Sequence, residues 1–169
     1  RGEYTYRFIE LLGEDKEFEL NRWDFYPTLH LSYALPAEQQ LMTSYTRRVS
    51  RTRGFYLEPF LTWEDAYNVR QGNPNLKPEY IDSYELSYQK KFKNGNVFSA
   101  DLYYRITNNK IERIRSVYEP NVFLNSVDNV GKDYSFGTEL MFGIDPTRWW
   151  HIDLMGNLYD YRQEGVILG

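Results

Sequence analysis

The chain of 169 residues contains 16 Tyr, 10 Phe and 4 Trp, and this aromatic content argues against intrinsic disorder. It contains no cysteine, which excludes a disulfide framework, a thiolate metal site and a cysteine nucleophile, and it has no run of about 18 apolar residues that could form a transmembrane helix. The formal net charge of −4 lacks the basic excess typical of nucleic-acid-binding proteins, so we expect no nucleic-acid partner.

Apolar and polar residues alternate with a period of two along most of the chain, a pattern typical of strands with one apolar and one polar face. Leu29, Leu31 and Tyr33, for example, fall on one face, and His30 and Ser32 fall on the other. In chain order, the alternation predicts about seven strands, over roughly residues 3–12, 25–35, 39–49, 80–92, 96–114, 129–144 and 148–162.

Short and long connections alternate between these strands. The short ones are residues 36–39, residues 93–96 with an Asn94-Gly95 pair that tolerates positive φ, and residues 145–147. The long ones are residues 13–24, 50–79 and 115–128 and the tail after residue 162. An up-and-down sheet gathers its short turns at one end and its long loops at the other, as a transmembrane β-barrel does. The connections therefore favour a barrel wall over a soluble meander.

Aromatic residues lie close to several predicted strand ends. Trp149 and Trp150 follow a short turn, and Tyr26 and Phe92 lie near the ends of two other strands. Tyr and Trp favour the membrane interface because the ring is apolar and its tip is polar. Ordinary cross-strand pairing in a soluble sheet explains the same positions equally well, so the aromatic residues alone leave both interpretations open.

The segment from Phe25 to Phe92 contains four distinctive motifs. They are Tyr26-Pro27 opening a strand that ends Leu31-Ser32-Tyr33, then Ser44-Tyr45-Thr46-Arg47-Arg48 at the end of the next strand, then Leu57-Glu58-Pro59-Phe60, and finally Gly72-Asn73-Pro74-Asn75-Leu76-Lys77-Pro78-Glu79 before Glu85-Leu86. Together with Asn129-Val130-Gly131 and residues 135–140 further on, they resemble the β-barrel of TonB-dependent outer-membrane receptors, specifically the outer-membrane-barrel family abundant in Bacteroidetes. The octapeptide 72–79 is the most specific of them.

The chain departs from this family pattern at two loop positions. Thr52 follows Arg51 where the resemblance leads us to expect a proline, and Glu58 precedes Pro59 where we expect an asparagine. Both departures lie in a loop that can face substrate, so they leave the specificity open without touching the architecture.

The resemblance implies an all-β fold, an antiparallel up-and-down meander of about seven strands that forms part of a larger transmembrane β-barrel of about 22 strands around a plug domain. Residues 1–169 would then be one partial β-barrel domain, with no plug domain, no signal peptide and no closing C-terminal strand. The last expectation rests on the ending Val166-Ile167-Leu168-Gly169, which has no terminal aromatic residue.

The resemblance also implies a function. We expect a fragment of a receptor in the outer membrane of a Gram-negative cell, with extracellular loops, that takes up a bulky nutrient such as a siderophore, cobalamin or a glycan. The implied partners are outer-membrane lipid, a plug domain, TonB and an unknown small-molecule or glycan substrate; no enzymatic activity and no cofactor are expected. Because an isolated open sheet has two bare edges and an apolar face, we also expect the fragment to self-associate through its edges or that face.

Four residues are candidate ligand contacts at the lumen rim and in the long loop. Arg48 and Arg51 belong to a basic run where a strand enters the loop, and they could bind an anionic group of the substrate. Pairing with carboxylates is the more common role for charges inside a barrel. Trp63 and Tyr67 lie in an aromatic-rich stretch that could stack on a ligand or pack the loop onto itself.

Turn chemistry explains the octapeptide without a ligand. Pro74 and Pro78 cannot donate to a β-ladder, Gly72 and Asn73 can adopt left-handed conformations, and the side chain of an asparagine can bond to nearby backbone. We interpret the segment as a rigid structural motif that sets the register of the strand that follows it.

No pattern in the chain predicts a catalytic or metal site. The only histidines, His30 and His151, lie on the polar face without metal-ligand spacing, although Asp153 shares that face with His151. Glu64 and Asp65 are sequence neighbours, so nothing opposes the two carboxyl groups as glycoside hydrolysis requires, and solvated loop charge is the better interpretation.

A second function remains open from the residues alone. The chain could be a soluble antiparallel β-sheet that binds carbohydrate through its aromatic residues. The sorted loop lengths and the octapeptide both argue against this alternative. Solubility in neutral buffer without detergent would separate the two hypotheses, because a lipid-facing belt aggregates in water.

Overall fold

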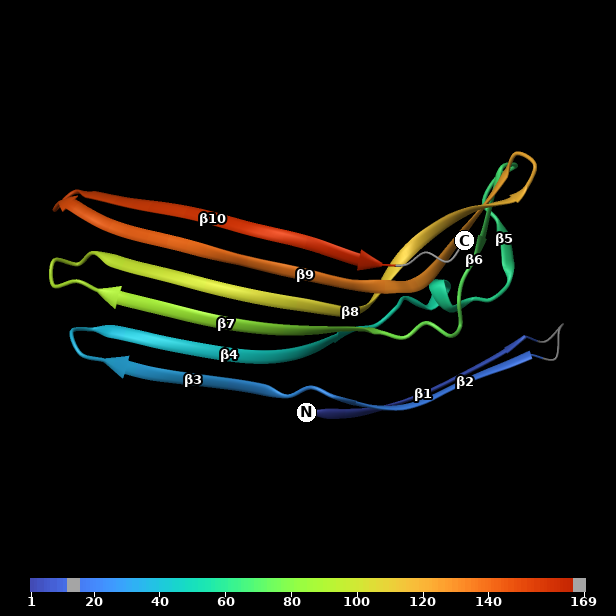
Figure 1. Ribbon diagram of the computed structural model, residues 1–169, viewed down its shortest axis with the longest axis horizontal. Coiled ribbons are helices and arrows are strands. Elements are labelled where there is room, and N and C mark those ends of the chain that lie inside the picture. The colour runs from blue at the N-terminus through green and yellow to red at the C-terminus, as the bar shows by residue number, and fades with distance from the viewer. Residues whose placement is uncertain (12–15, 166–169) are drawn as a thin grey trace.

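Strands make up most of the chain in the computed structural model, which describes residues 1–11 and 16–165 (Figure 1). In chain order the elements are β1 (Gly2–Leu11), β2 (Lys16–Phe25), β3 (Thr28–Leu35), β4 (Gln39–Ser50), the 3-10 helix η1 (Gly54–Leu57), β5 (Leu61–Trp63), β6 (Asn68–Gln71), β7 (Glu79–Lys91), β8 (Val97–Glu119), β9 (Val122–Thr147) and β10 (Trp150–Gly165). Residue 12 of the first predicted strand and residues 166–169, on which the expected lack of a closing strand rests, lie outside the described residues. No helix in the described ranges is long and apolar enough to cross a membrane.

The large sheet is the antiparallel meander that the sequence predicts. Strands β3, β4, β7, β8, β9 and β10 lie side by side in that order, and each pairs antiparallel with the next. The β3–β4, β7–β8 and β9–β10 turns gather at one end of the sheet, called here the short-turn end (Figure 1). The β1–β2 hairpin, η1, β5, β6 and the β8–β9 turn lie at the other, the loop end (Figure 1). The predicted sorting of short and long connections is confirmed.

Three predicted long links contain regular structure. Most of the 13–24 link is β2, which pairs along the whole of β1, so the prediction of a loop there is wrong from residue 16 onward. The prediction of a long loop over residues 115–128 is also wrong, because β8 and β9 continue there as a hairpin with a tight turn at Asn121, where φ is 69°. The 50–79 link holds η1, β5 and β6. β2 and the outer parts of β8 and β9 pair with the strand next to them in sequence, whereas β6 pairs with the distant β9, which local alternation does not reveal.

One ladder departs from the antiparallel rule. Residues 68–70 of β6 pair parallel to residues 123–125 of β9, and β5 pairs antiparallel with β6. The η1–β5–β6 loop is thereby fixed to the outer part of the β8–β9 hairpin, residues 110–130, which we call the β8–β9 extension.

The strand register aligns the apolar residues of successive strands into rows on one face. Tyr45, Tyr84, Tyr104 and Phe136 stand directly opposite one another across β4, β7, β8 and β9, with ring centroids 5.0 Å apart in the Tyr45–Tyr84 pair. A second row, closer to the short-turn end, contains Thr43, Leu86, Leu102, Thr138 and Leu158. Leu102 and Leu158 are 42% and 73% exposed. The predicted apolar face is confirmed, and no second layer of the described chain covers it.

Positive φ angles mark the turns and the bend of the sheet. Ala37 and Glu38 form the β3–β4 turn with φ of 62° and 56°, whereas in the β7–β8 turn Gly95 has positive φ and Asn94 does not. The β8–β9 ladder is interrupted at the unpaired Asn109, where φ is 55°, beside the pair that Lys110 forms with Gly131, where φ is 155°. Both strands bend strongly between the sheet and the β8–β9 extension (Figure 1), so this interruption directs the extension over the loop end.

The small hydrophobic core lies at the loop end and not within the sheet. Leu57 of η1, Leu76 of the octapeptide and Val127 of β9 are buried against one another, and Ile9, Tyr56 and Ile111 pack around them. Because a single-layer sheet buries little on either face, this core fixes the loops to the sheet, and it positions the pocket described next.

Candidate functional site

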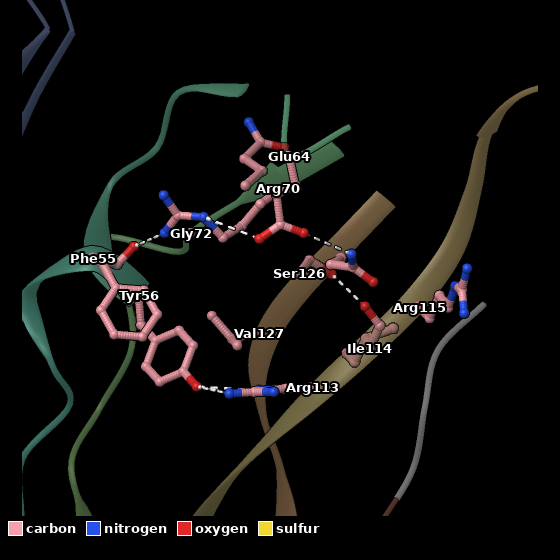
Figure 2. A pocket seen from close by; sticks show the side chains of 12 residues that line it. Phe55, Tyr56, Glu64, Arg70, Gly72, Arg113, Ile114, Arg115, Ser126 and Val127 are labelled. Carbon is pink, nitrogen blue, oxygen red and sulfur yellow. Dashed lines mark hydrogen bonds and ion pairs between the residues drawn. The ribbon is translucent and has the colours of Figure 1, made fainter. Parts of the chain in front are cut away.

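A pocket of about 280 Å³ lies between the η1–β6 loop and the β8–β9 extension. Three arginines, two aromatic residues and several small polar groups line it: Phe55, Tyr56, Glu64, Arg70, Gln71, Gly72, Arg113, Ile114, Arg115, Asn125, Ser126 and Val127. Figure 2 shows Tyr56 and Arg113 meeting on one side of the pocket and Arg70 and Glu64 on the other, with Val127 between them. The pocket is thus formed by two parts of the chain that are far apart in sequence.

The octapeptide holds the loop side of this pocket in place. The Gly72 N–H donates to the Glu58 carbonyl at 2.8 Å, and the Asn73 N–H donates to the Tyr56 carbonyl at 2.7 Å. A Cβ at position 72 would lie 2.5 Å from the Tyr56 oxygen and 2.6 Å from the Glu58 oxygen. Gly72 is therefore required for close backbone approach and not for a left-handed conformation, since neither Gly72 nor Asn73 has positive φ.

The rest of the octapeptide connects the loop to β1 and to the β8–β9 hairpin. The Asn75 N–H donates to the Asn73 side-chain oxygen at 2.9 Å, and Arg7 donates to the Pro74 carbonyl at 2.6 Å. Lys77 and Asn129 exchange two hydrogen bonds of 2.8 and 2.9 Å. The Asn109 side chain donates to the Pro78 carbonyl at 3.4 Å, and the Ile111 N–H donates to Glu79 at 3.0 Å. The contacts of Lys77, Pro78 and Glu79 hold the chain that leads into β7 against β8 and β9.

Arg70 is held within the loop by neighbouring acceptors. Its guanidinium donates to the Phe55 carbonyl at 3.0 Å and to Glu58 Oε2 at 3.4 Å, and Nε lies 3.9 Å from Glu64 Oε1. The guanidinium also lies over the Phe55 ring, 5.4 Å from its centroid. These contacts direct the charge of Arg70 toward the loop that it stabilises.

Arg113 and Arg115 project from the β8–β9 extension and are both exposed. Arg113 donates through Nε and Nη2 to the Tyr56 hydroxyl at 3.1 and 2.7 Å, and this hydrogen bonding raises the pKa of the Arg113 guanidinium. Arg115 donates to Asn68 Oδ1 at 3.3 Å and lies 4.1 Å from the centroid of the Phe123 ring. Within the described ranges, neither guanidinium lies within ion-pair distance of a carboxylate, so both retain donors for a ligand.

Asp65 organises the β5–β6 turn at the edge of the pocket. Its Oδ1 accepts from the Tyr67 N–H at 2.7 Å, and its two oxygens accept from the Asn68 side chain at 3.0 and 2.8 Å. Hydrogen bonding from the Tyr67 N–H, followed by that from Asn68, lowers the pKa of Asp65 below its ordinary value of 3.8. The same Asn68 side chain accepts from Arg115, so the turn supports the pocket.

We expect this turn to loosen only in strong acid. Because the pKa of Asp65 is lower in the folded state, the stabilisation is present above pH 3.8 and is lost as the pH falls through the lower folded value. An NMR titration should therefore show the Tyr67 amide resonance moving with a midpoint below 3.8, and the Asp65→Asn variant should remove this transition. A midpoint at or above 3.8 would contradict the assignment.

The four ligand-contact residues proposed from the sequence do not converge on one site. Arg51 pairs with Glu3 and donates to the Tyr26 hydroxyl at 3.1 Å, while Arg48 is exposed on β4. Trp63 and Tyr67 are 56% and 64% exposed near the β5–β6 turn, and none of the four lines the arginine pocket. The sequence analysis did not select Arg70, Arg113 or Arg115, which line the pocket. The one available signal was that Arg113 and Arg115 stand at alternate positions of a single strand and so share one face.

Two further polar clusters lie outside the pocket. Asp82 accepts a two-pronged hydrogen bond from Arg47 at 2.7 and 3.0 Å and a third bond from the Tyr45 hydroxyl at 2.7 Å. At the short-turn end, His151 lies 2.6 Å from Asp145 and 3.2 Å from Asp153. Within residues 1–11 and 16–165, no group of three or more His, Asp or Glu side chains is arranged to hold a metal ion.

Comparisons with known proteins agree on the type of fold. A model of the outer membrane protein β-barrel family matches residues 1–167. The hemophore receptor HasR of Serratia marcescens, solved as a double mutant with its hemophore HasA and heme, has a TM-score of 0.68 and 18% identity over 87% of this chain. The ferric enterobactin receptor PfeA of Pseudomonas aeruginosa, solved as a mutant with enterobactin, has a TM-score of 0.64 and 20% identity over 93%.

At these identities the likeness to the two receptors shows a shared fold. The chain spans 24% of the length of each of them. Comparison with curated protein sequences gives no significant match.

Proposed function

Since the chain belongs to the outer membrane protein β-barrel family, we propose that it forms part of the wall and the extracellular loops of a TonB-dependent receptor. In this proposal the receptor takes up a bulky nutrient, such as a siderophore, cobalamin or a glycan, with energy supplied through TonB. The barrel binds and encloses its cargo and performs no covalent chemistry. The apolar face of the sheet, aligned by strand register, is the observation that carries the proposal.

The height of that face supports a membrane-spanning role. Phe136 marks the aromatic row nearer the loop end, and Thr147, eleven positions later on β9, pairs with Trp150 at the short-turn end. At about 3.4 Å per residue and a strand tilt of about 45°, this distance corresponds to about 26 Å along the barrel axis. The outward-facing apolar band of outer-membrane barrels is about 25 Å tall and is bordered by aromatic residues at both interfaces. The same exposed face disfavours the soluble carbohydrate-binding alternative.

The polar face supports a partner inside the barrel. Asp101 and Glu139 stand directly opposite each other on β8 and β9, and like charges in such a pair are destabilising. Glu85 lines the same shallow depression, where Arg105 is the only cation among the lining residues. A plug domain that presents cationic side chains would relieve this repulsion, and it is the partner we propose for this face.

The free edges support a place in a larger wall. Among the described strands, β3 pairs only with β4, and β10 pairs only with β9. Neighbouring strands of the same barrel would cover both edges. We therefore propose that residues 1–169 are part of a larger barrel domain. The expected self-association of the isolated fragment stays a prediction.

Cysteine labelling tests both the orientation and the apolar face. These residues contain no cysteine, so single substitutions can be placed in the full-length protein after any other cysteine is replaced by serine. A membrane-impermeant maleimide added to intact cells should label Asn121→Cys at the loop end. Asn94→Cys at the short-turn end should react only after the outer membrane is permeabilised.

A second pair of variants separates lipid from water. Leu102→Cys, on the apolar face, should resist a hydrophilic maleimide in membranes and react after denaturation. Equal labelling of Asn94→Cys and Asn121→Cys in intact cells would overturn the proposed orientation. Rapid labelling of Leu102→Cys in intact membranes would overturn the membrane-wall role.

A further inference from the structure

We propose that the arginine-lined pocket binds one acidic sugar residue, with Arg113 binding its carboxylate, Arg115 adding positive charge, and Glu64 and Asn125 binding its hydroxyl groups. This inference rests on the proposed function, because it requires the loop end to face the medium from which nutrients are captured. It deepens that function by naming the chemical class of the group that the loops bind.

The charge arrangement favours an anion. Arg70 is already satisfied by Glu58, Glu64 and the Phe55 carbonyl. Arg113 and Arg115 are not within ion-pair distance of a carboxylate in the part of the chain that the structure describes, although Glu64 and Asp65 lie close enough to interact weakly with Arg113 and Arg115 respectively. The two residues alternate on β8, so their backbones are about 6.6 Å apart and their side chains share one face. The Arg113 guanidinium reaches toward Tyr56 and the Arg115 guanidinium toward Asn68 and Phe123. A carboxylate bound by Arg113 is therefore also attracted by the second positive charge on the same face.

Arg113 is held ready for such a ligand. Its Nε and one Nη2 hydrogen contact the Tyr56 hydroxyl, and the guanidinium lies 5.8 Å from the centroid of the Tyr56 ring. A guanidinium has five N–H donors in a planar fork, so the Nη1–Nη2 edge stays available for a two-pronged bond to a carboxylate. Tyr56 itself packs against the buried core. Less side-chain freedom is therefore lost when the ligand binds.

The remaining polar groups favour a sugar over a simple anion. Glu64 is an acceptor only, and it already accepts from the Asn125 side chain at 3.2 Å. Hydrogen phosphate would bring two negative charges toward Glu64 and a single hydroxyl donor, and a fully deprotonated catecholate would bring two negative charges and no donor. A sugar acid brings hydroxyl donors, which suit Glu64, together with one carboxylate, which suits Arg113.

The size and the aromatic lining agree with a single sugar ring. A volume of about 280 Å³ lies just below the range of about 300 to 1,000 Å³ typical of sites for drug-sized ligands. Phe55 and Tyr56 offer adjacent rings, with centroids 4.1 Å apart, beside the polar groups. Such a pocket accommodates one residue of a larger nutrient and leaves the rest in the barrel mouth.

Calorimetric titration of the full-length protein in detergent tests the assignment. D-galacturonate should bind, and D-galactose, which has the same ring without the carboxylate, should bind at least tenfold more weakly. Citrate, which offers carboxylates and a hydroxyl without a ring, should bind more weakly than galacturonate. Tighter binding of citrate, or no measurable binding of galacturonate, would overturn the proposal.

Variants locate the binding in the pocket. Arg113→Ala should lower the affinity for galacturonate by about 10- to 100-fold, the loss expected for a hydrogen-bonded charge partner, and Arg113→Lys should lower it less. Arg148→Ala, which removes the same charge at the short-turn end, should leave the affinity unchanged. Arg115→Ala provides a second removal if Arg113→Ala folds poorly. Affinity within twofold of wild type in both alanine variants would overturn the proposal.

The cysteine-labelling pattern separates this proposal from the proposed function. If Asn121→Cys still labels in intact cells while galacturonate fails to bind, the pocket assignment is wrong and the receptor role stands. If the labelling itself fails, the receptor role is wrong, and the loop end does not face the medium.

Discussion

Replacement of Gly131 by alanine should disrupt the junction between the sheet and the β8–β9 extension. Gly131 has φ of 155°, a region open essentially only to glycine, and an added Cβ would overlap the Glu164 carbonyl oxygen and lie 2.7 Å from the Gly165 Cα. The strained backbone costs about 1–3 kcal/mol, and the forced separation of β9 from β10 costs a similar amount. We therefore expect the free energy of unfolding to fall by about 3 kcal/mol or more. Urea unfolding of the refolded full-length protein measures this loss.

The matched control for Gly131→Ala lies on the neighbouring strand. Gly156 of β10 has no atom within 4 Å of an added Cβ and has no positive φ. Gly156→Ala should therefore change the unfolding free energy by less than about 1 kcal/mol, as expected for a substitution without a clash or a strained backbone. Equal effects of the two alanines would show that glycine content, and not the close approach at the bend, determines the result.

Replacement of Leu76 by alanine should release the loop end from the sheet. Leu76 is 2% exposed, and it packs with Leu57 and Val127 in the small core. Truncation of a buried leucine typically costs about 2–5 kcal/mol, from lost burial and from the cavity that remains. We expect the free energy of local opening at the loop end to fall by about 3 kcal/mol. Amide hydrogen exchange in η1 and in the octapeptide should become correspondingly faster.

This variant also separates a structural from a ligand-binding role for the octapeptide. Leu61→Ala removes a leucine that is 42% exposed in the same loop, and it should change hydrogen exchange little. Leu76→Ala should also weaken galacturonate binding, because Tyr56 packs against the core that Leu76 fills. Unchanged exchange in both variants would contradict the view that the octapeptide fixes the loops.

Local alternation was sufficient for the strands of the large sheet. Residues such as Leu29, Leu31 and Tyr33 predict their own face, because side chains in a strand alternate sides whatever strand lies beside them. The three short turns followed from turn chemistry within a few residues. The arrangement of connections then followed from the up-and-down order of the strands, and each of these predictions is confirmed.

The pocket could not be predicted in the same way. Tyr56 meets Arg113 across 57 positions of sequence, and Glu64 meets Asn125 across 61. The candidate residues chosen from the sequence, Arg48, Arg51, Trp63 and Tyr67, do not line this pocket, and their contact with a ligand stays a prediction. Only the pairing of β6 with β9 shows which arginines line a common pocket.

The sequence by itself thus determined the strand faces, the turns at one end and the resemblance to outer-membrane barrels, since each depends on residues close together in the chain. The tertiary structure alone decided the β8–β9 extension, the parallel β6–β9 ladder and the pairing partners of the three pocket arginines. The parallel ladder and the contacts of Arg113 and Arg115 join residues tens of positions apart. The extension is a local hairpin, and the bend at its base decides where it lies. The arrangement of these features is set by the summed packing around Leu76 and by the bend at Gly131, not by any local pattern of side chains.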